Sequence, residues 1–163
     1  MRRIMVIGCP GSGKSTFSRE LHERTGIPLW HLDMMYWNAD RTTVERSVFL
    51  QRLTDATDGD EWIIDGNFNS TLELRMQRCD TVIFLDYPLE VCLDGIRSRK
   101  GKPRTDIPWV EKADEEDSSF IDSVKGYNSD SRPNVMRLLA KYSYKEIVIF
   151  RSRREATDFL ERL

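Results

Sequence analysis

The stretch GCPGSGKS, residues 8–15, follows a short apolar run and fits the pattern G-x-x-x-x-G-K-[ST]. In this pattern, small residues allow successive backbone N–H groups to turn inward around phosphate oxygens. The Lys14 side chain is expected to reach the β- and γ-phosphates, and the Ser15 hydroxyl is expected to ligate Mg²⁺. The stretch therefore predicts a nucleoside triphosphate site, held by Gly8, Pro10, Gly11, Ser12, Gly13, Lys14, Ser15 and Thr16.

The flanking residues place a strand before this loop and a helix after it. Residues 4–7 are continuously apolar, and Phe17 and Leu21 recur at helical spacing until Gly26 ends the helix. A helix N-terminus presents unpaired N–H groups and a favourable dipole to an anion. The alternative interpretation is a chance glycine-rich turn, and the strand–loop–helix context argues against it.

Length and composition indicate a single globular domain over residues 1–163. The chain is 39% hydrophobic, and we find no second phosphate loop or internal repeat in it. Its net charge is −2, so it lacks the excess of positive charge typical of nucleic-acid-binding domains. Residues 97–104 (RSRKGKPR) are a local exception, and a DNA partner would have to bind there.

The cysteines and the hydropathy pattern favour a cytoplasmic protein. Cys9, Cys79 and Cys92 are odd in number and lack metal-ligand spacing, so we expect buried thiols in a reducing compartment. A reactive thiol at Cys9 is the alternative. Because no apolar stretch approaches the length of a membrane span, we expect no membrane partner.

Five short apolar runs have the character of strands, and helical patterns alternate with them. Runs that are continuously apolar, rather than polar at every second residue, are typical of a parallel sheet covered on both faces. Ligands of such sheets bind at the carboxyl ends of the strands. The predicted strands are Ile4–Ile7, Pro28–Leu32, Glu61–Ile64, Thr81–Leu85 and Lys145–Phe150.

Three carboxylates lie where predicted strands end, at the same edge as the phosphate loop. Asp65 precedes Gly66, which would let the backbone pass close to a ligand, and we expect Asp65 to hold the Mg²⁺ shell through water. Asp33 precedes a bulky Met-Met-Tyr-Trp segment and could orient or deprotonate an acceptor hydroxyl. Asp86 is a third candidate for the metal site. Each of the three has an alternative role in a turn or a helix cap.

A basic segment, residues 97–106, follows a predicted helix and contains Gly101 and Pro103, which break regular structure. Beside a phosphate loop, arginines on such a flap could neutralise the γ-phosphate and exclude water when the flap closes. A solvated charged loop is the alternative. Arg132, before Pro133 at a predicted helix start, could reach the same phosphates.

These motifs together resemble the bacterial DNA topology-modulation proteins, small P-loop proteins akin to adenylate kinase. The resemblance runs in order over nearly the whole chain, and its specificity rests on HLD, IDGN and the spacing to TVIFLD. It implies an α/β P-loop NTPase fold of the nucleoside/nucleotide kinase type, with three layers, a five-stranded parallel sheet in the order 2-3-1-4-5, and a lid at about residues 99–118. The matching segments are GCPGSGKST, HLDMMYW, WIIDGNF, DTVIFLDYP, KGKPRTD and SRP.

The resemblance also implies roles for individual residues. Asp65 would lie near Mg²⁺, and Arg99 and Arg104 would be lid arginines. Arg132 would clamp the transferring phosphate, and Arg153 would lie beside the adenine.

The chain departs from these relatives at two positions. Gly95 stands where the family usually has an arginine, and Asn69 stands where adenylate kinases carry the arginine that grips a nucleoside monophosphate. Arg75 and Arg78 lie three residues apart on one predicted helix face, and one of them could contact the acceptor. A surface position is the alternative for that residue.

We therefore expect an ATP- and Mg²⁺-dependent phosphotransferase of the nucleoside or nucleotide kinase type. Its small acceptor would bind between Asp33, the adjacent aromatic residues and the segment 65–78, and catalysis would come chiefly from positioning and charge neutralisation. The alternative is a nucleotide-dependent binding module of the topology-modulation type. Its ATP state would order the flap and present it to DNA or to a protein partner.

Overall fold

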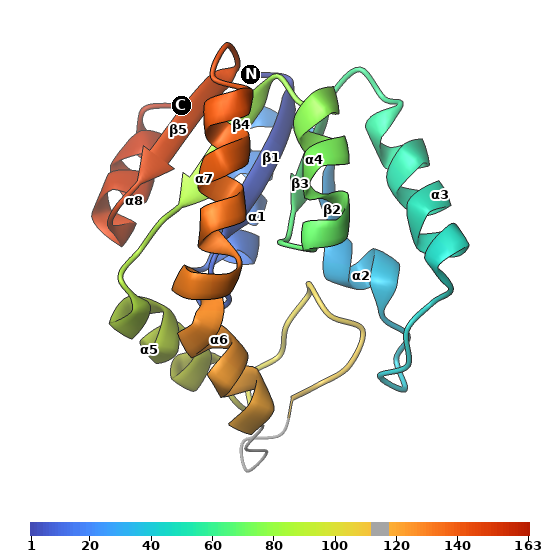
Figure 1. Ribbon diagram of the computed structural model, residues 1–163, viewed down its shortest axis with the longest axis vertical. Helices are drawn as coiled ribbons and strands as arrows, with labels where there is room; N and C mark the ends of the chain where they lie inside the picture. Colours follow the sequence, from blue (N-terminus) through green and yellow to red (C-terminus); the bar gives the residue numbers. More distant parts are fainter. Residues whose placement is uncertain (112–117) are drawn as a thin grey trace.

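The computed structural model describes residues 1–111 and 118–163 and has a five-stranded sheet at its centre (Figure 1). All neighbouring strands are parallel, in the order β2-β3-β1-β4-β5. This confirms the predicted α/β fold and its strand order. The strands are β1 (Arg3–Gly8), β2 (Leu29–His31), β3 (Trp62–Asp65), β4 (Thr81–Leu85) and β5 (Glu146–Phe150).

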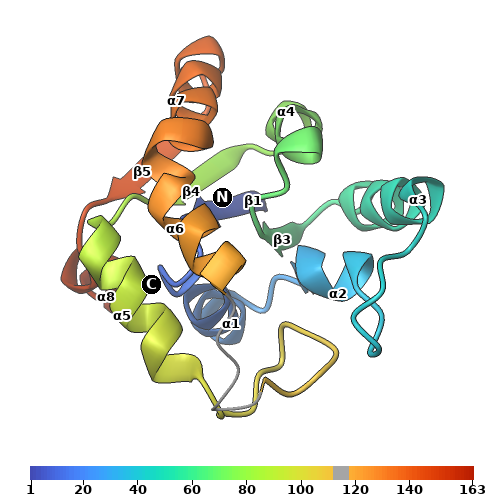
Figure 2. The same ribbon diagram turned by 60° about the horizontal axis from the view of Figure 1, so that its bottom comes forward.

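Helices cover both faces of the sheet, as Figures 1 and 2 show. On one face, Ile4 and Val6 pack with residues of α1 (Lys14–Thr25), α5 (Leu89–Arg99), α6 (Ser118–Asp130) and α8 (Arg153–Glu161). On the other, Met5 and Ile7 pack with residues of α2 (Leu32–Tyr36), α3 (Arg46–Thr57), α4 (Asn69–Arg78) and α7 (Arg132–Lys141). Since successive side chains of a strand point to opposite faces, a strand buried on both faces is apolar throughout.

The carboxyl edge of the sheet holds many of the residues that the sequence predicts to be functional. The phosphate loop follows β1, and Asp65 is the last residue of β3. Asp33 was expected at the end of the second strand, but β2 stops at His31 and Asp33 lies in the first turn of α2. That turn begins directly after the strand, so Asp33 still lies at this edge.

The lid begins where α5 ends. Residues 100–111 form an irregular segment that runs beneath the carboxyl edge toward α2, drawn in yellow in Figures 1 and 2. Near its end, the Trp109 ring meets the Trp37 ring, with their centroids 5.7 Å apart. The predicted lid spans residues 99–118, of which residues 112–117 lie outside the described part of the chain.

The cysteines are buried as free thiols. Burial raises the pKa of the Cys79 thiol to about 11. Over residues 1–111 and 118–163, no helix combines the length and the apolar character needed to cross a membrane.

The backbones of α5 and the phosphate loop are in direct contact. A Cβ atom at Gly95 would lie 2.0 Å from the carbonyl oxygen of Gly11, and a Cβ atom at Gly11 would lie 2.0 Å from that of Cys92. Real Cβ atoms do not approach backbone this closely, so neither glycine can be replaced without moving the helix or the loop. The arginine usual in the resembling family at position 95 therefore does not fit this packing.

We predict that Gly95→Ala destabilises the protein although alanine is the better helix former. Intrinsic propensity alone would favour alanine by about 1 kcal/mol, whereas overpacking typically costs about 1–3 kcal/mol or more. The free energy of unfolding and the affinity for ATP should both fall, measured by denaturant titration and calorimetry. The matched control is Gly59→Ala, whose new Cβ would find its nearest neighbour at an ordinary 3.6 Å; equal effects of the two substitutions would contradict the packing argument.

Candidate active site

The phosphate loop has the backbone conformation that its sequence pattern requires. Gly11 and Gly13 take positive φ angles of 83° and 93°, a region that favours glycine. Lys14 begins α1, and its Nζ donates to the carbonyl oxygens of Gly8 at 2.9 Å and Cys9 at 3.2 Å. Burial lowers the pKa of Lys14, while the negative charges of Asp65 and Asp33 oppose that shift. The Lys14 ammonium group is thus hydrogen-bonded to the backbone of the loop that is predicted to bind phosphate.

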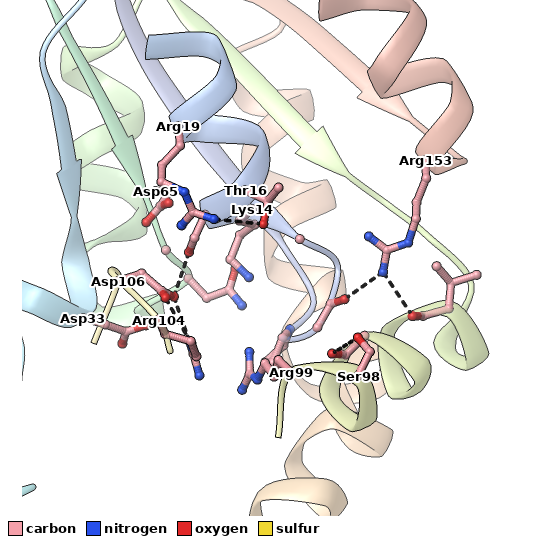
Figure 3. Close-up of a pocket in the computed structure, with 18 of the residues that line it drawn as sticks. Lys14, Thr16, Arg19, Asp33, Asp65, Ser98, Arg99, Arg104, Asp106 and Arg153 are labelled. Atoms are coloured by element: carbon pink, nitrogen blue, oxygen red, sulfur yellow. Dashed lines mark hydrogen bonds and ion pairs between the residues drawn. The ribbon is translucent and has the colours of Figure 1, made fainter. Parts of the chain in front are cut away.

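Arg153, at the start of α8, supports the outer side of the same loop. Its guanidinium donates to the carbonyl oxygens of Ser12 at 3.1 Å and Gly11 at 3.2 Å. Figure 3 shows Arg153 reaching from α8 toward the loop. It also lies 5.7 Å from the centre of the Tyr87 ring. A loop that turns its N–H groups inward must turn carbonyl groups outward, and Arg153 satisfies two of them.

The loop after β3 is held by a buried arginine. Arg75 of α4 is fully buried, and its guanidinium donates to the carbonyl oxygens of Gly66, Asn67 and Phe68. In the same loop, Asn67 Oδ1 accepts a hydrogen bond from the Gly8 N–H at 3.2 Å, which ties this loop to the phosphate loop. Arg75, considered above for acceptor contact, is therefore committed to the backbone of this loop.

Two carboxylates from the carboxyl edge lie close to Lys14. Asp65 is 4% exposed, and its Oδ2 lies 2.8 Å from His31 Nδ1. Burial opposes protonation of His31, but the hydrogen bond and the charge of Asp65 outweigh it and raise the His31 pKa. Burial also raises the pKa of Asp33, with the positive charge of Lys14 acting in the opposite direction.

The lid contacts the phosphate loop through one carboxylate. Ser15 Oγ donates to Asp106 Oδ2 at 2.8 Å. Arg104 binds the same carboxylate with two hydrogen bonds, of 3.1 and 2.7 Å, and also donates to Glu111 at 2.9 Å. Arg99, whose pKa burial lowers, lies 3.7 Å from another oxygen of Glu111.

These side chains line one cavity of about 1060 Å³ over the phosphate loop. Figure 3 shows them converging from the loop, from the strand ends and from the lid. The proposed site residues that the cavity brings together are Pro10, Gly11, Gly13, Lys14, Ser15, Thr16, Asp33, Asp65, Arg99, Arg104 and Arg153. Gly8 and Ser12 belong to the same loop but are not among the described lining residues.

Asp86 and Arg132 are placed differently from the sequence-based expectation. Arg132 donates two hydrogen bonds to the Asp86 carboxylate, at 2.9 and 2.8 Å, and Arg151 donates to the same group. Neither Asp86 nor Arg132 is among the described residues that line the cavity. In the structure Asp86 and Arg132 are thus paired with each other outside the described lining of the cavity, and their roles at the metal and at the phosphates stay predictions.

A second cavity of about 390 Å³ adjoins the first. Asp33, Arg99 and Arg104 line both cavities, so the second opens beside the same carboxylate and the same lid cations. Its walls include the indole rings of Trp37 and Trp109. A small polar molecule with an apolar face would fit a space of this size and lining.

The donor set suits Mg²⁺ bound together with phosphates. Among the described residues, no group of three or more His, Cys, Asp or Glu side chains could hold a metal ion on its own. Mg²⁺ usually keeps several waters and takes one or two carboxylates plus substrate phosphates, rather than a cage made of protein. The Ser15 hydroxyl and the Asp65 carboxylate, which line the same cavity, fit that mode.

Sequence reasoning missed three residues that organise the site. His31 was passed over although it pairs in register with Asp65 across β2 and β3. The sequence points to Arg75 as a candidate for acceptor contact and does not predict its hydrogen bonds to the β3–α4 loop. Asp106 is the last residue of the basic segment, and the sequence does not predict its contact with Ser15. The signal available for Asp106 was an acidic residue two positions after Arg104 in a segment otherwise rich in cations.

Comparison with known proteins agrees with this geometry. A family model described as an AAA domain matches residues 4–118. The chain belongs to this AAA domain family. The match includes the phosphate loop, all but the first residue of β1, the strands β2 to β4 and the whole of the predicted lid segment. A search of curated proteins finds none that matches the sequence.

Three solved shikimate kinases share the fold of this AAA-domain chain. The enzyme from Aquifex aeolicus is 19% identical with a TM-score of 0.59, and the alignment covers 98% of this chain and 92% of that one. The enzyme from Bacteroides thetaiotaomicron is 18% identical with a TM-score of 0.58, covering 99% and 95%. The enzyme from Acinetobacter baumannii, in complex with shikimate, is 15% identical with a TM-score of 0.65, covering 99% and 90%. The AAA-domain chain thus has a P-loop, kinase-like, nucleotide-binding fold.

We predict that Arg75→Ala lowers the free energy of unfolding by about 3 kcal/mol or more, because it leaves buried carbonyl groups without a donor. Denaturant titration measures the change. The matched control is Arg78→Ala on the same helix, which removes a half-exposed arginine bonded to Thr57 and Asp58. That variant should lose no more than about 1 kcal/mol, and equal losses would show that Arg75 does not support the loop in this way.

Proposed function

We propose that residues 1–163 act as a single-domain phosphotransferase of the nucleoside/nucleotide kinase type, which transfers the γ-phosphoryl group of ATP to a small acceptor in the presence of Mg²⁺. One observation carries the proposal. Lys14, Arg99, Arg104 and Asp33 line one cavity over the phosphate loop, and Asp33 also lines the second cavity beside it. This juxtaposition of cations, a carboxylate and space for a second small molecule supports a transfer reaction.

The cations supply what phosphoryl transfer demands. Charge on the transferring group is spread over its oxygens, and catalysis comes largely from positioning and neutralising that charge. Lys14 would bind the β- and γ-phosphates from the loop, and Arg99 and Arg104 would approach them from the lid. Mg²⁺, when bound, would neutralise the phosphates further, with Ser15 and Asp65 as its nearest protein groups.

Asp33 is the residue best placed to act on the acceptor. An acceptor hydroxyl oxygen would attack the γ-phosphorus, the bond from that phosphorus to the bridging oxygen would break, and ADP would leave with the bond electrons. The hydroxyl proton would pass to the Asp33 carboxylate. Burial raises the pKa of Asp33, which makes its carboxylate a stronger base than that of an exposed aspartate.

The acceptor is proposed to occupy the second cavity. Its lining joins lid cations to indole rings, which favours a hydroxylated molecule that carries both an anionic group and an apolar face. The shikimate kinases act as a precedent for a small acceptor on this fold, but at 15–19% identity they do not identify the acceptor of this chain.

The alternative, a nucleotide-switched binding module for DNA, draws support from the resemblance to topology-modulation proteins. It would require lid cations that are available to a phosphate backbone. In the structure Arg99 and Arg104 line the cavity over the phosphate loop together with Lys14, and the net charge of the chain is −2. These two observations favour the phosphotransferase.

We predict that ADP formation from Mg²⁺-ATP is stimulated by one pool among nucleoside monophosphates, nucleosides and small hydroxy acids. Lys14→Ala should lower that stimulated rate by about 100-fold or more, because the variant loses the cation that binds the transferring phosphate. The control is Lys125→Ala, which removes an exposed lysine of α6. Tight ATP binding without stimulation by any pool would instead favour the binding module.

We predict a pH dependence set by Asp33. Only the ionised carboxylate can accept the proton, so kcat/KM should fall as the pH drops through the Asp33 pKa, which burial raises above its ordinary value of about 3.9. Initial rates measured across the acidic range test this. Asp33→Asn should be nearly inactive, and its residual rate should lack that acidic limb; a variant with full activity and the same limb would rule out Asp33 as the base.

A further inference from the structure

The hydrogen bond between the lid and the phosphate loop has a definite direction. Ser15 Oγ donates to Asp106 Oδ2 at 2.8 Å, across 91 positions of sequence, and Asp106 is only 6% exposed. A serine hydroxyl has one hydrogen and two acceptor lone pairs. When the hydrogen is committed to Asp106, the lone pairs point elsewhere and stay available. A hydroxyl that ligates a metal must be arranged in this way, because the metal binds the oxygen through a lone pair.

The Asp106 carboxylate is held in place by Arg104. The Arg104 guanidinium donates two hydrogen bonds to it, at 3.1 Å and 2.7 Å, one to each carboxylate oxygen. The Ser15 hydrogen therefore has an acceptor whose orientation Arg104 fixes.

Asp65, the carboxylate at the end of β3, does not accept the Ser15 hydrogen in the structure. Asp65 Oδ2 lies 2.8 Å from His31 Nδ1, a contact that draws its carboxylate toward β2. The group that orients Ser15 thus comes from the lid and not from the sheet. In the structure the Ser15 hydroxyl is thus oriented by a residue of the docked lid.

We propose that Asp106 is a positioning residue that acts from the lid on Ser15, so that binding of Mg²⁺ with the nucleotide and closure of the lid strengthen each other. The inference rests on the proposed function in one respect, namely that a Mg²⁺–nucleotide complex occupies the cavity. Linkage requires reciprocity: if a docked lid improves the metal site, bound metal must favour the docked lid to the same degree. Because Asp106 also holds Arg104, closure brings a γ-phosphate cation into the site at the moment when the metal site is complete.

The test measures binding and needs no turnover. ADP affinity is determined by calorimetry with Mg²⁺ and with EDTA, and the ratio of the two affinities is the enhancement by Mg²⁺. Loss of a group that orients a metal ligand typically weakens metal binding about 10–100-fold. Asp106→Ala should therefore reduce the enhancement by about that factor while leaving ADP affinity in EDTA nearly unchanged.

A matched control separates this contact from general loosening of the lid. Thr105 accepts a hydrogen bond from Arg19 of α1 at 3.1 Å, so Thr105→Val removes a neighbouring link between the lid and α1 without touching Ser15. Its Mg²⁺ enhancement should equal that of the wild type. An equal loss of the Mg²⁺ enhancement in Asp106→Ala and Thr105→Val would overturn the proposal. Any contact that docks the lid would then explain the enhancement, without a specific effect of Asp106 on Ser15.

Two further variants make the result specific to the Ser15 contact. Ser15→Ala should lose the enhancement, and adding Asp106→Ala to it should cause little further loss, whereas additive losses would show that Asp106 acts elsewhere. Asp106→Asn retains an acceptor oxygen and the size of the side chain, so it serves if the alanine variant does not fold and should give a smaller loss. Tighter Mg²⁺-ADP binding by either variant would also overturn the proposal, since Asp106 would then occupy the place of the metal.

The lid itself gives the reciprocal measurement. Trp109 lies in the lid against Trp37 and is one of four tryptophans, so a fluorescence change that Trp109→Phe abolishes reports docking. Mg²⁺-ADP should change the wild-type signal more than ADP in EDTA does, and Asp106→Ala should abolish that difference. ATP turnover plays no part in these measurements, so they would stand even if the chain proved to be a binding module rather than a kinase.

Discussion

The inward turn of the phosphate loop is the constraint on which the rest of the structure depends. A loop that points its N–H groups at an anion points its carbonyl groups outward, and each of these needs a donor. Arg153 of α8 and Lys14 of α1 supply donors to the carbonyl groups of Gly8, Cys9, Gly11 and Ser12. The close approach of Gly95 then leaves α5 in backbone contact with the loop. Helices distant in sequence are thereby fixed around one eight-residue stretch.

Pairing of opposite charges keeps the site assembled. Lys14 shares its cavity with the carboxylates of Asp33 and Asp65, and the lid arginines are paired with Asp106 and Glu111. Many like charges in one cavity would repel one another, and these pairings offset that repulsion. A nucleotide adds negative charge at the loop and gives the lid cations a new partner. The same arrangement thus serves both the resting protein and the proposed transfer reaction.

The lid also forms part of the proposed acceptor cavity. This cavity is lined by residues of the lid, of the segment after β2 and of the helices α5 and α6, so its shape depends on how these parts pack. Trp37 and Trp109 meet edge to face in its lining. The shape of this cavity depends on how such aromatic rings pack against each other. A sequence gives the residue types and not their packing, so the aromatic residues alone do not identify the acceptor.

Local patterns were sufficient to predict most of the fold. Continuous apolar runs located all five strands, and the strand order that the resemblance implied is the observed one. The first helix ends at Gly26, as the sequence predicted, and Gly26 has a φ of 73°, in the left-handed region that favours glycine. The position of Asp33 was off by part of a turn, because a three-residue strand gives a pattern too short to mark where the helix begins.

The sequence by itself determined the phosphate loop, the parallel sheet and the carboxylates at its edge, because these follow from residue types at short spacing. Only the tertiary structure decided which charges meet. Asp86 and Arg132 pair with each other across 46 positions, Asp106 reaches Ser15 across 91, and Arg75 turns inward to a loop backbone. A charged side chain has the same character in every context, and its role depends on which partner the folded chain brings within hydrogen-bond distance.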